Sequence, residues 1–165
     1  MTERVLIAAL AEQNRAIGKN GKIPWSLPGD LRRFKRLTTD QAVIMGRKTW
    51  ELDLEQKPLA DRMNIVVTSQ PDRFQAKQNP SLQFVASLET ALQLGENYGQ
   101  SFIIGGSSLY WEMVMLVDRW ELTLVEGQYA GDSFFPPYQH LIGSLYNRVD
   151  QVIHSGYRFE TYRRF

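Results

Sequence analysis

The stretch "SFIIGGSSLYWEM", residues 101–113, joins two kinds of local structure. Phe102–Ile104 is a short, apolar, β-branched run of the kind found in buried strands. Gly105–Gly106 ends that run, and the spacing of Leu109, Met113 and Leu116 then indicates a helix. The glycines allow a ligand close approach to the backbone, and we expect the two serines that follow to cap the helix. A strand, a glycine turn and a helix are the repeating unit of an α/β domain.

Similar apolar runs recur along the chain, and several are separated by segments with helical spacing. This alternation predicts an α/β fold, in which a mostly parallel central sheet is flanked by about four helices. The last third has no clear helix between Gln151–His154 and Tyr157–Arg163, so we predict a C-terminal antiparallel hairpin at the sheet edge, turning near Ser155–Gly156. We expect one domain over residues 1–165. The remaining strand-like runs are Val5–Ala11, Ala42–Met45, Ile65–Thr68, Leu82–Val85 and Leu122–Val125, and the remaining helical patterns are Leu31/Phe34/Leu37 and Leu88/Ala91/Leu92.

The composition narrows the function classes. The chain has 165 residues, 43% of them hydrophobic and 22% charged, with a formal net charge of +1. This balance indicates no nucleic-acid or membrane partner, and no signal-peptide pattern is present. The absence of cysteine fits a reducing compartment, so we expect a cytoplasmic location. His140 and His154 lie far apart without metal-ligand spacing, so we expect no metal, and we take a monomer as the default.

One acidic residue lies on an unexpected face of a predicted helix. In "IPWSLPGDLRRFKRLT", residues 23–38, Pro28 suits a first helical turn. Asp30 falls within the apolar stripe and Lys35 at its border. The acid could simply stabilise the helix dipole. An unpaired carboxylate facing apolar surface is costly, however, so a donor such as the adjacent N–H groups of a planar heterocycle is expected to meet it. An apolar setting would also raise its pKa, which suits proton transfer near neutral pH. The stripe consists of Leu27, Leu31, Phe34 and Leu37, with Arg32, Arg33 and Arg36 on the opposite side.

Three predicted strand ends carry groups that could hold an anionic ligand. "AVIMGRKTWE" passes from a strand through Gly46 to an apparent helix start at Arg47–Thr49. "IVVTSQP" ends a strand with Thr68 and Ser69, and the Gly105–Gly106 turn is the third end. Each signal alone is weak, since no dinucleotide or P-loop fingerprint is present. Together they favour an extended, multiply anionic ligand at the carboxyl edge of the sheet.

The order of these motifs resembles dihydrofolate reductase over nearly the whole chain. The specific blocks are W-x-L-P-x-D-L, with Phe34–Lys35, and M-G-R-x-T-W. The resemblance implies hydride transfer from NADPH to 7,8-dihydrofolate, which gives tetrahydrofolate for one-carbon and thymidylate metabolism. It also implies that antifolate inhibitors are ligands.

On the substrate side, the resemblance implies that Asp30 holds the 2-amino group and N3 of the pterin and favours protonation of N5 through water. Thr123 would hydrogen-bond that acid, and Arg62 would grip the α-carboxylate of the glutamate tail. Trp25 would anchor a lid and organise water. The ring walls would come from Ile7, Ala8, Leu31, Phe34 and Ile104, with Lys35 adding charge and Tyr110 touching the nicotinamide carboxamide or packing under it.

On the cofactor side, the resemblance implies a cis bond between Gly105 and Gly106, beside the nicotinamide and pyrophosphate. "GKNGKIPW", residues 18–25, resembles a mobile lid, and "EGQYAGD", ending at Asp132, resembles the loop that hydrogen-bonds to it. We call residues 18–25 the lid loop. The other cofactor-side residues are Ala9, Ile17 and Gly18 along the nicotinamide and ribose, Gly46, Arg47, Lys48, Thr49, Thr68 and Ser69 toward the pyrophosphate and 2′-phosphate, and Ser107, Ser108 and Leu109 after the glycines.

Some positions depart from the family pattern. Ser107 replaces the third glycine, and Ser108 stands where some bacterial members have an arginine. The connection "LDLEQK", residues 52–57, is longer and more acidic than usual, with Leu54 as a guessed apolar contact. Three alternatives remain: a pteridine- or nucleotide-binding module without turnover, a reductase of riboflavin precursors, and a serine hydrolase built on Ser107.

Overall fold

The computed structural model describes all 165 residues and contains a central sheet of eight strands. Its order is β5-β4-β3-β6-β1-β7-β10-β9. The first six strands in this order, from β5 through β7, are all parallel. Strand β10 pairs antiparallel with both β7 and β9. The mostly parallel sheet with an antiparallel C-terminal hairpin is therefore confirmed. The strands are β1 (Glu3–Ala11), β2 (Ala16–Gly18), β3 (Ala42–Gly46), β4 (Met63–Val67), β5 (Leu82–Val85), β6 (Gln100–Ile103), β7 (Arg119–Val125), β8 (Ser133–Phe134), β9 (Tyr146–His154) and β10 (Tyr157–Arg164).

Three α-helices and three short helical turns accompany the sheet. The helices are α1 (Pro28–Thr38), α2 (Leu88–Gly95) and α3 (Ser107–Met113). The turns are the π turn η1 (Thr49–Asp53) and the 3-10 turns η2 (Pro71–Lys77) and η3 (Gln139–Leu141). The spacing of Leu109, Met113 and Leu116 predicted that the third helix reaches Leu116, and this prediction was wrong. Helix α3 ends at Met113, and Leu116 is 63% exposed in the turn that leads into β7.

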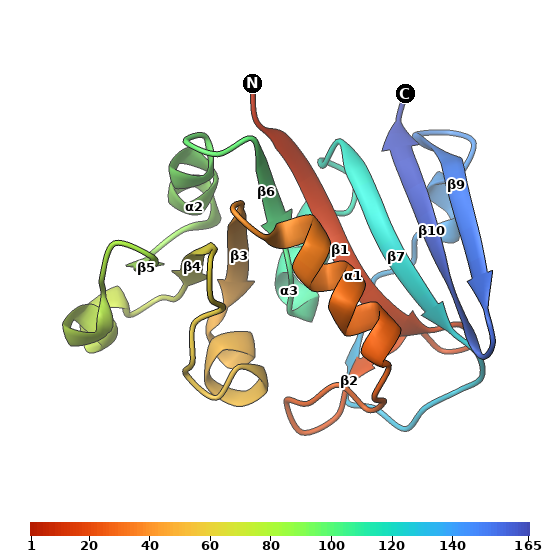
Figure 1. Cartoon of the computed structure of the whole chain (residues 1–165), viewed down its shortest axis with the longest axis horizontal. Coiled ribbons are helices and arrows are strands. Elements are labelled where there is room, and N and C mark those ends of the chain that lie inside the picture. The colour runs from red at the N-terminus through yellow and green to blue at the C-terminus, as the bar shows by residue number, and fades with distance from the viewer.

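The sheet separates two apolar cores because successive strand residues point to opposite faces. On β1, Val5 and Ile7 contribute to one core, which Phe34 of α1 contacts. Leu6 and Leu10 of the same strand contribute to the other, together with residues of α2 and α3. Helices therefore cover both faces, which explains the continuous apolar runs of the parallel strands. Figure 1 shows α1 in front of β1 and α3 behind the sheet.

The parallel strands all end at one edge of the sheet, which lies at the bottom of Figure 1. The ends of β3 and β6 are adjacent there, since Ile44 pairs with Ile103. The small sheet of β2 and β8 lies at the same edge and was not predicted, because strands of two or three residues leave no periodic signal. No helix is both long and apolar enough to cross a membrane.

Candidate active site

Pro28 is the first residue of α1, so Asp30 lies in the first turn of this helix. This turn lies at the carboxyl edge of the sheet. The hydroxyl of Thr123, on β7, donates a hydrogen bond of 2.6 Å to Asp30 Oδ1. Burial raises the pKa of the Asp30 carboxyl, and the Thr123 hydrogen bond and the Arg33 charge only partly oppose this. The expected rise in the pKa of this acid is therefore present.

The apolar stripe of α1 is only half covered by protein, contrary to the expectation that all of it faces buried surface. Phe34 and Leu37 pack against a core, whereas Leu31 is 58% exposed. The physical reason is that no other element covers the helix turn that carries Leu31. That turn also carries Asp30, so apolar surface open to a ligand lies beside the acid.

Arg33, on the other side of α1, is half-buried rather than facing solvent. It forms an ion pair with Glu121 of β7, and its guanidinium carbon lies 4.4 Å from the ring centre of Phe159. Sequence reasoning did not predict this pair. The available signal was Glu121 itself, a carboxylate close to the apolar run Leu122–Val125, which would need a cation when buried.

Arg62 is buried and held by two acceptors. Its Nε donates to the Ala60 carbonyl at 2.9 Å, and its Nη1 donates to Thr38 Oγ1 at 3.1 Å. Burial lowers the pKa of the guanidinium, which stays protonated at neutral pH. The guanidinium carbon lies 5.8 Å from the Phe34 ring, so Arg62 belongs to the same side of the site as α1. Lys35 is exposed and forms no ion pair.

The Gly105–Gly106 peptide bond is cis, as the resemblance implied. Gly46 N donates to the Gly105 carbonyl at 2.8 Å, so the ends of β3 and β6 meet at the glycines. Gly105 has φ of +124°, and a Cβ there would lie 3.3 Å from the Tyr110 hydroxyl. At Gly106 a Cβ would meet only Thr49 Oγ1, at 3.5 Å. Three glycines thus leave backbone open to a ligand at this junction.

The expected capping of α3 by serine side chains was wrong. Gly106 is the N-cap residue, and no side chain bonds the first turn of the helix. The serines fall one position too late, because the helix begins at Ser107 itself. Ser107 also has no hydrogen bond to a histidine, which leaves the hydrolase alternative without support. Leu109 is buried in the core beneath the helix.

Tyr110 links the two halves of the site. Its hydroxyl donates to the carbonyl of Ile7 at 2.8 Å. The pKa of this phenol is raised, first by burial and then by the negative charges of Asp53 and Asp30. Both carboxylates therefore lie close enough to affect Tyr110, which itself adjoins Gly105. Ile7 and Ala8 are buried on β1, and Ala9 and Ile104 are half-buried next to them in the sheet.

The ends of β3 and β4 carry the expected cationic and hydroxyl groups. A helical turn does begin at Arg47, but it continues only as η1. Arg47 Nη1 lies 3.0 Å from Glu51 Oε2, so part of its charge is already compensated, while Lys48 is exposed. Thr68 is buried and its hydroxyl accepts a bond from the Gln70 amide, whereas Ser69 is exposed.

The lid loop is hydrogen-bonded to the loop 126–132, as the resemblance implied. Asp132 accepts from the Asn20 amide at 2.9 Å, and its own amide donates to the Gly18 carbonyl at 3.0 Å. The Trp25 ring contacts Tyr129 edge-on, with ring centres 5.1 Å apart. Trp25 Nε1 is buried and has no hydrogen-bond partner in the protein. Ile17 packs against the core that contains Leu6 and Leu10.

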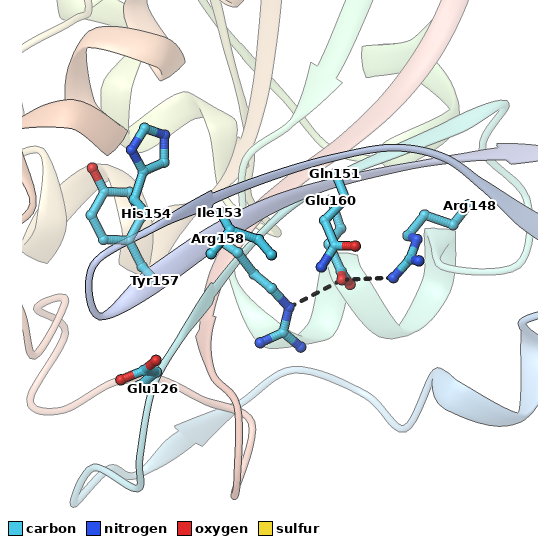
Figure 2. A pocket seen from close by; sticks show the side chains of 8 residues that line it. All are labelled: Glu126, Arg148, Gln151, Ile153, His154, Tyr157, Arg158 and Glu160. Atoms are coloured by element: carbon cyan, nitrogen blue, oxygen red, sulfur yellow. Dashed lines mark hydrogen bonds and ion pairs between the residues drawn. The ribbon is translucent and has the colours of Figure 1, made fainter.

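A separate surface hollow of about 320 Å³ lies along the β9–β10 hairpin and contains none of the predicted site residues. Figure 2 shows that Glu160 lies between Arg148 and Arg158, with N–O distances of 3.2 and 3.1 Å. Arg158 also pairs with Glu12 at 2.9 Å, so the two arginines and the two carboxylates compensate one another and the hollow offers a ligand little free charge. No group of three or more His, Asp or Glu side chains could hold a metal ion.

The sheet, the acid beside an apolar helix turn and the glycine junction define an α/β protein with a candidate ligand site at the carboxyl edge of its strands. The sequence model of the family "Dihydrofolate reductase" matches residues 4–164. The chain therefore belongs to the dihydrofolate reductase family, and the expected enzyme class, an NADPH-dependent oxidoreductase, is confirmed. This family also excludes the riboflavin-precursor reductase alternative.

Individual relatives agree with this family. The chain is 43% identical to the dihydrofolate reductase type 3 of Salmonella typhimurium over 136 residues, which cover 82% of this chain and 80% of the relative. It is 36% identical to the dihydrofolate reductase of Bacillus subtilis strain 168 over 157 residues, covering 93% and 90%. A solved structure of the Enterococcus faecalis dihydrofolate reductase, complexed with NADP(H) and RAB-propyl, matches with a TM-score of 0.83 and 33% identity, covering 98% of this chain and 96% of that one.

Proposed function

We propose that the chain reduces 7,8-dihydrofolate to tetrahydrofolate with NADPH and that Asp30 assists protonation of N5. The observation that carries this proposal is the Asp30–Thr123 pair. Oδ1 accepts the Thr123 hydroxyl at 2.6 Å, whereas no protein donor bonds Oδ2. A pterin offers adjacent N–H donors at its 2-amino group and N3, which would complete the hydrogen bonding of the carboxylate.

The raised pKa of Asp30 supports a role in proton transfer. A carboxyl that keeps a proton closer to neutral pH is a better source for N5 than an ordinary exposed aspartate. Trp25 Nε1 is buried and has no hydrogen-bond partner in the protein, which suits a residue that orders a water molecule. Asp30, Thr123 and Trp25 are thus the proposed catalytic group.

The rest of the substrate would extend along α1 toward Arg62. The buried Arg62 has a fixed orientation because Ala60 and Thr38 hold two of its donors, and the remaining donors would bind the α-carboxylate of the glutamate tail. Lys35 would add positive charge at the exposed end. The proposed apolar walls are Ile7, Ala8, Leu31, Phe34 and Ile104, with Tyr110 beneath them.

The cofactor would lie across the carboxyl edge from the lid loop to β4. The glycine junction fits a ligand in backbone contact, since side chains at Gly105 or Gly106 would meet Tyr110 or Thr49. Arg47, Lys48, Thr49, Thr68 and Ser69 would hold the pyrophosphate and 2′-phosphate, and their charge would favour NADPH over NADH. When bound, NADPH supplies the hydride that C6 of the substrate accepts. Ala9, Ile17, Gly18, Gly46, Ser107, Ser108 and Leu109 complete the proposed cofactor side.

A direct assay tests the proposal. The purified chain is mixed with NADPH and dihydrofolate, and loss of NADPH absorbance is followed, with Asp30→Asn as the matched variant. We expect turnover by the wild type and a large loss in the variant. Binding of both ligands without turnover would instead support a binding module. That residues 1–165 form one monomeric, cytoplasmic domain that binds antifolates and no nucleic acid stays a prediction.

A further inference from the structure

The lid loop contacts the protein on two sides. One side is the hydrogen-bonded contact with Asp132 described above. The other side is the acidic connection 52–57. Figure 1 shows the loop between β2 and α1 reaching toward the helical turn that follows β3. This second contact combines apolar packing with charge.

The apolar part is the contact between Gly21 and Leu52. A Cβ at Gly21 would lie 2.4 Å from Leu52 Cβ and 2.6 Å from Leu52 Cδ1, so the backbone of the loop rests directly on this side chain. Gly21 also has φ of +77°, which favours glycine. Any side chain at this position would push the loop away from the connection.

The charged part centres on Lys22. Its Nζ lies 3.0 Å from Glu55 Oε1. Burial raises the pKa of Asp53, and the Lys22 charge partly offsets this rise. The Lys22–Glu55 pair therefore joins the connection to the lid loop by charge.

The connection 52–57 is itself fixed to the rest of the protein by hydrogen bonds of Gln56 and by packing of Leu54. Gln56 N donates to the Trp50 carbonyl at 2.9 Å, and Gln56 Oε1 accepts from Lys77 Nζ on η2 at 2.5 Å. Leu54 packs against the core that contains Trp50. A segment attached to the core on one side and to the loop on the other can act as a fixed support.

We propose that Lys22 is a positioning residue, which Leu52 and Glu55 hold so that the connection 52–57 anchors the lid loop independently of Asp132. The inference rests on the proposed function, which places Ile17, Gly18 and Trp25 of this region beside the nicotinamide end of the cofactor. With two anchors, the loop keeps these residues against the site. Weakening the second anchor therefore loosens the loop and shortens the residence of NADPH.

The test uses charge reversal and charge swap in the full chain. Variants Lys22→Glu, Glu55→Lys and the double variant are compared with Arg4→Glu, which breaks the exposed Arg4–Glu96 pair, whose distance is 3.2 Å. Hydrogen exchange of residues 19–25 is measured without ligand, and NADPH dissociation is measured by stopped flow. Lys22→Glu should raise both rates about two- to five-fold, as expected for an exposed ion pair, and the swap should largely restore them.

Each outcome decides the proposal. Faster exchange in Lys22→Glu, recovery in the double variant and no change in Arg4→Glu support the second anchor. Unchanged exchange in Lys22→Glu, or no recovery in the swap, overturns it. Because exchange is read in the ligand-free chain, it decides the anchor even if NADPH turns out not to bind. Failure of the proposed function would appear separately, as absence of turnover in the wild type.

Discussion

Two carboxylates join α1 to β7, and their surroundings differ. Asp30 meets Thr123, and Glu121, two residues earlier on the same strand, meets Arg33 from the next turn of the helix. Glu121 also accepts the Thr161 hydroxyl at 2.8 Å. Arg119 Nε lies 2.9 Å from it, close enough for an ion pair although its N–H is not aligned for a hydrogen bond. Asp30, in contrast, accepts one hydrogen bond, from the neutral Thr123 hydroxyl to Oδ1, and no protein group donates to its Oδ2.

The difference separates an acid whose charge is compensated within the protein from one that stays available to a ligand. The negative charge of Glu121 is compensated by Arg33 and Arg119, so nothing else is needed there. The carboxylate of Asp30 is desolvated and has no ion-pair partner. Its pKa is therefore raised, because burial disfavours the charged form. An incompletely satisfied carboxylate at the open end of the strand can bind a ligand that supplies the missing donors.

The largest expected effect is that of Asp30→Asn. Without an ionisable group at this position the rate of dihydrofolate reduction should fall by about 10²- to 10⁴-fold at neutral pH. It should recover partly as the pH falls, because solvent can then protonate the substrate. Single-turnover kinetics with NADPH over a pH series measure this. A rate equal to that of the wild type would show that the proton comes from elsewhere.

Glu121→Ala should act on stability instead. Removing this buried acid leaves Arg33 without its partner and Arg119 with Glu3 alone, which should cost about 3–5 kcal/mol of unfolding free energy. Urea denaturation checks this, and the folded fraction should keep most of its kcat. If activity per folded molecule fell as far as in Asp30→Asn, the proposed division between the two acids would be incorrect.

Thr123→Val should have an intermediate effect. Loss of a hydrogen bond to a charged group corresponds to about 1.5–3 kcal/mol, or roughly ten- to hundred-fold in the rate or in substrate affinity. Because this bond lowers the pKa of Asp30, its loss should shift the pH profile of the rate upward. Thr161→Val, which removes the corresponding donor to Glu121, is the control and should leave the profile in place.

The smallest effect concerns stability against pH. The pKa of Asp30 is higher in the folded than in the unfolded chain, so folding takes up protons between the ordinary value of 3.8 and the raised one. The stabilisation from this group is present at low pH and is lost as the pH rises through the raised pKa. Asp30→Asn has no carboxyl to ionise and does not lose this stabilisation, so its thermal midpoint should increase relative to that of the wild type as the pH rises. A constant difference between about pH 4 and about pH 8 would contradict the raised pKa.

Much of the fold could be predicted because its signals are local. Strand runs such as Leu82–Val85 coincide with the observed strand, and the hairpin turns where Ser155–Gly156 predicts. Asp30 was recognisable from its place on the helical wheel, since the angle between residues of one helix is set by 100° steps. The family motifs then indicated Thr123, Arg62 and the cis glycine pair.

Other features depend on which segments meet. Arg33 lies opposite the apolar stripe, a position typical of a solvated charge, and only the packing of α1 on β7 and β10 places it against Glu121 and Phe159. The same holds for the pairing of Lys22 with Glu55 and of β2 with β8, which are distant in sequence.

By itself, the sequence determined the order of the main-sheet strands and the reductase family, and it singled out Asp30 as a candidate, because periodicity and motifs reside in neighbouring residues. The tertiary structure alone decided which charges are neutralised and which stay available. Burial and pairing arise between residues far apart in the chain, so Asp30 and Glu121, both acids near apolar residues, acquire different surroundings only when α1 packs on the sheet.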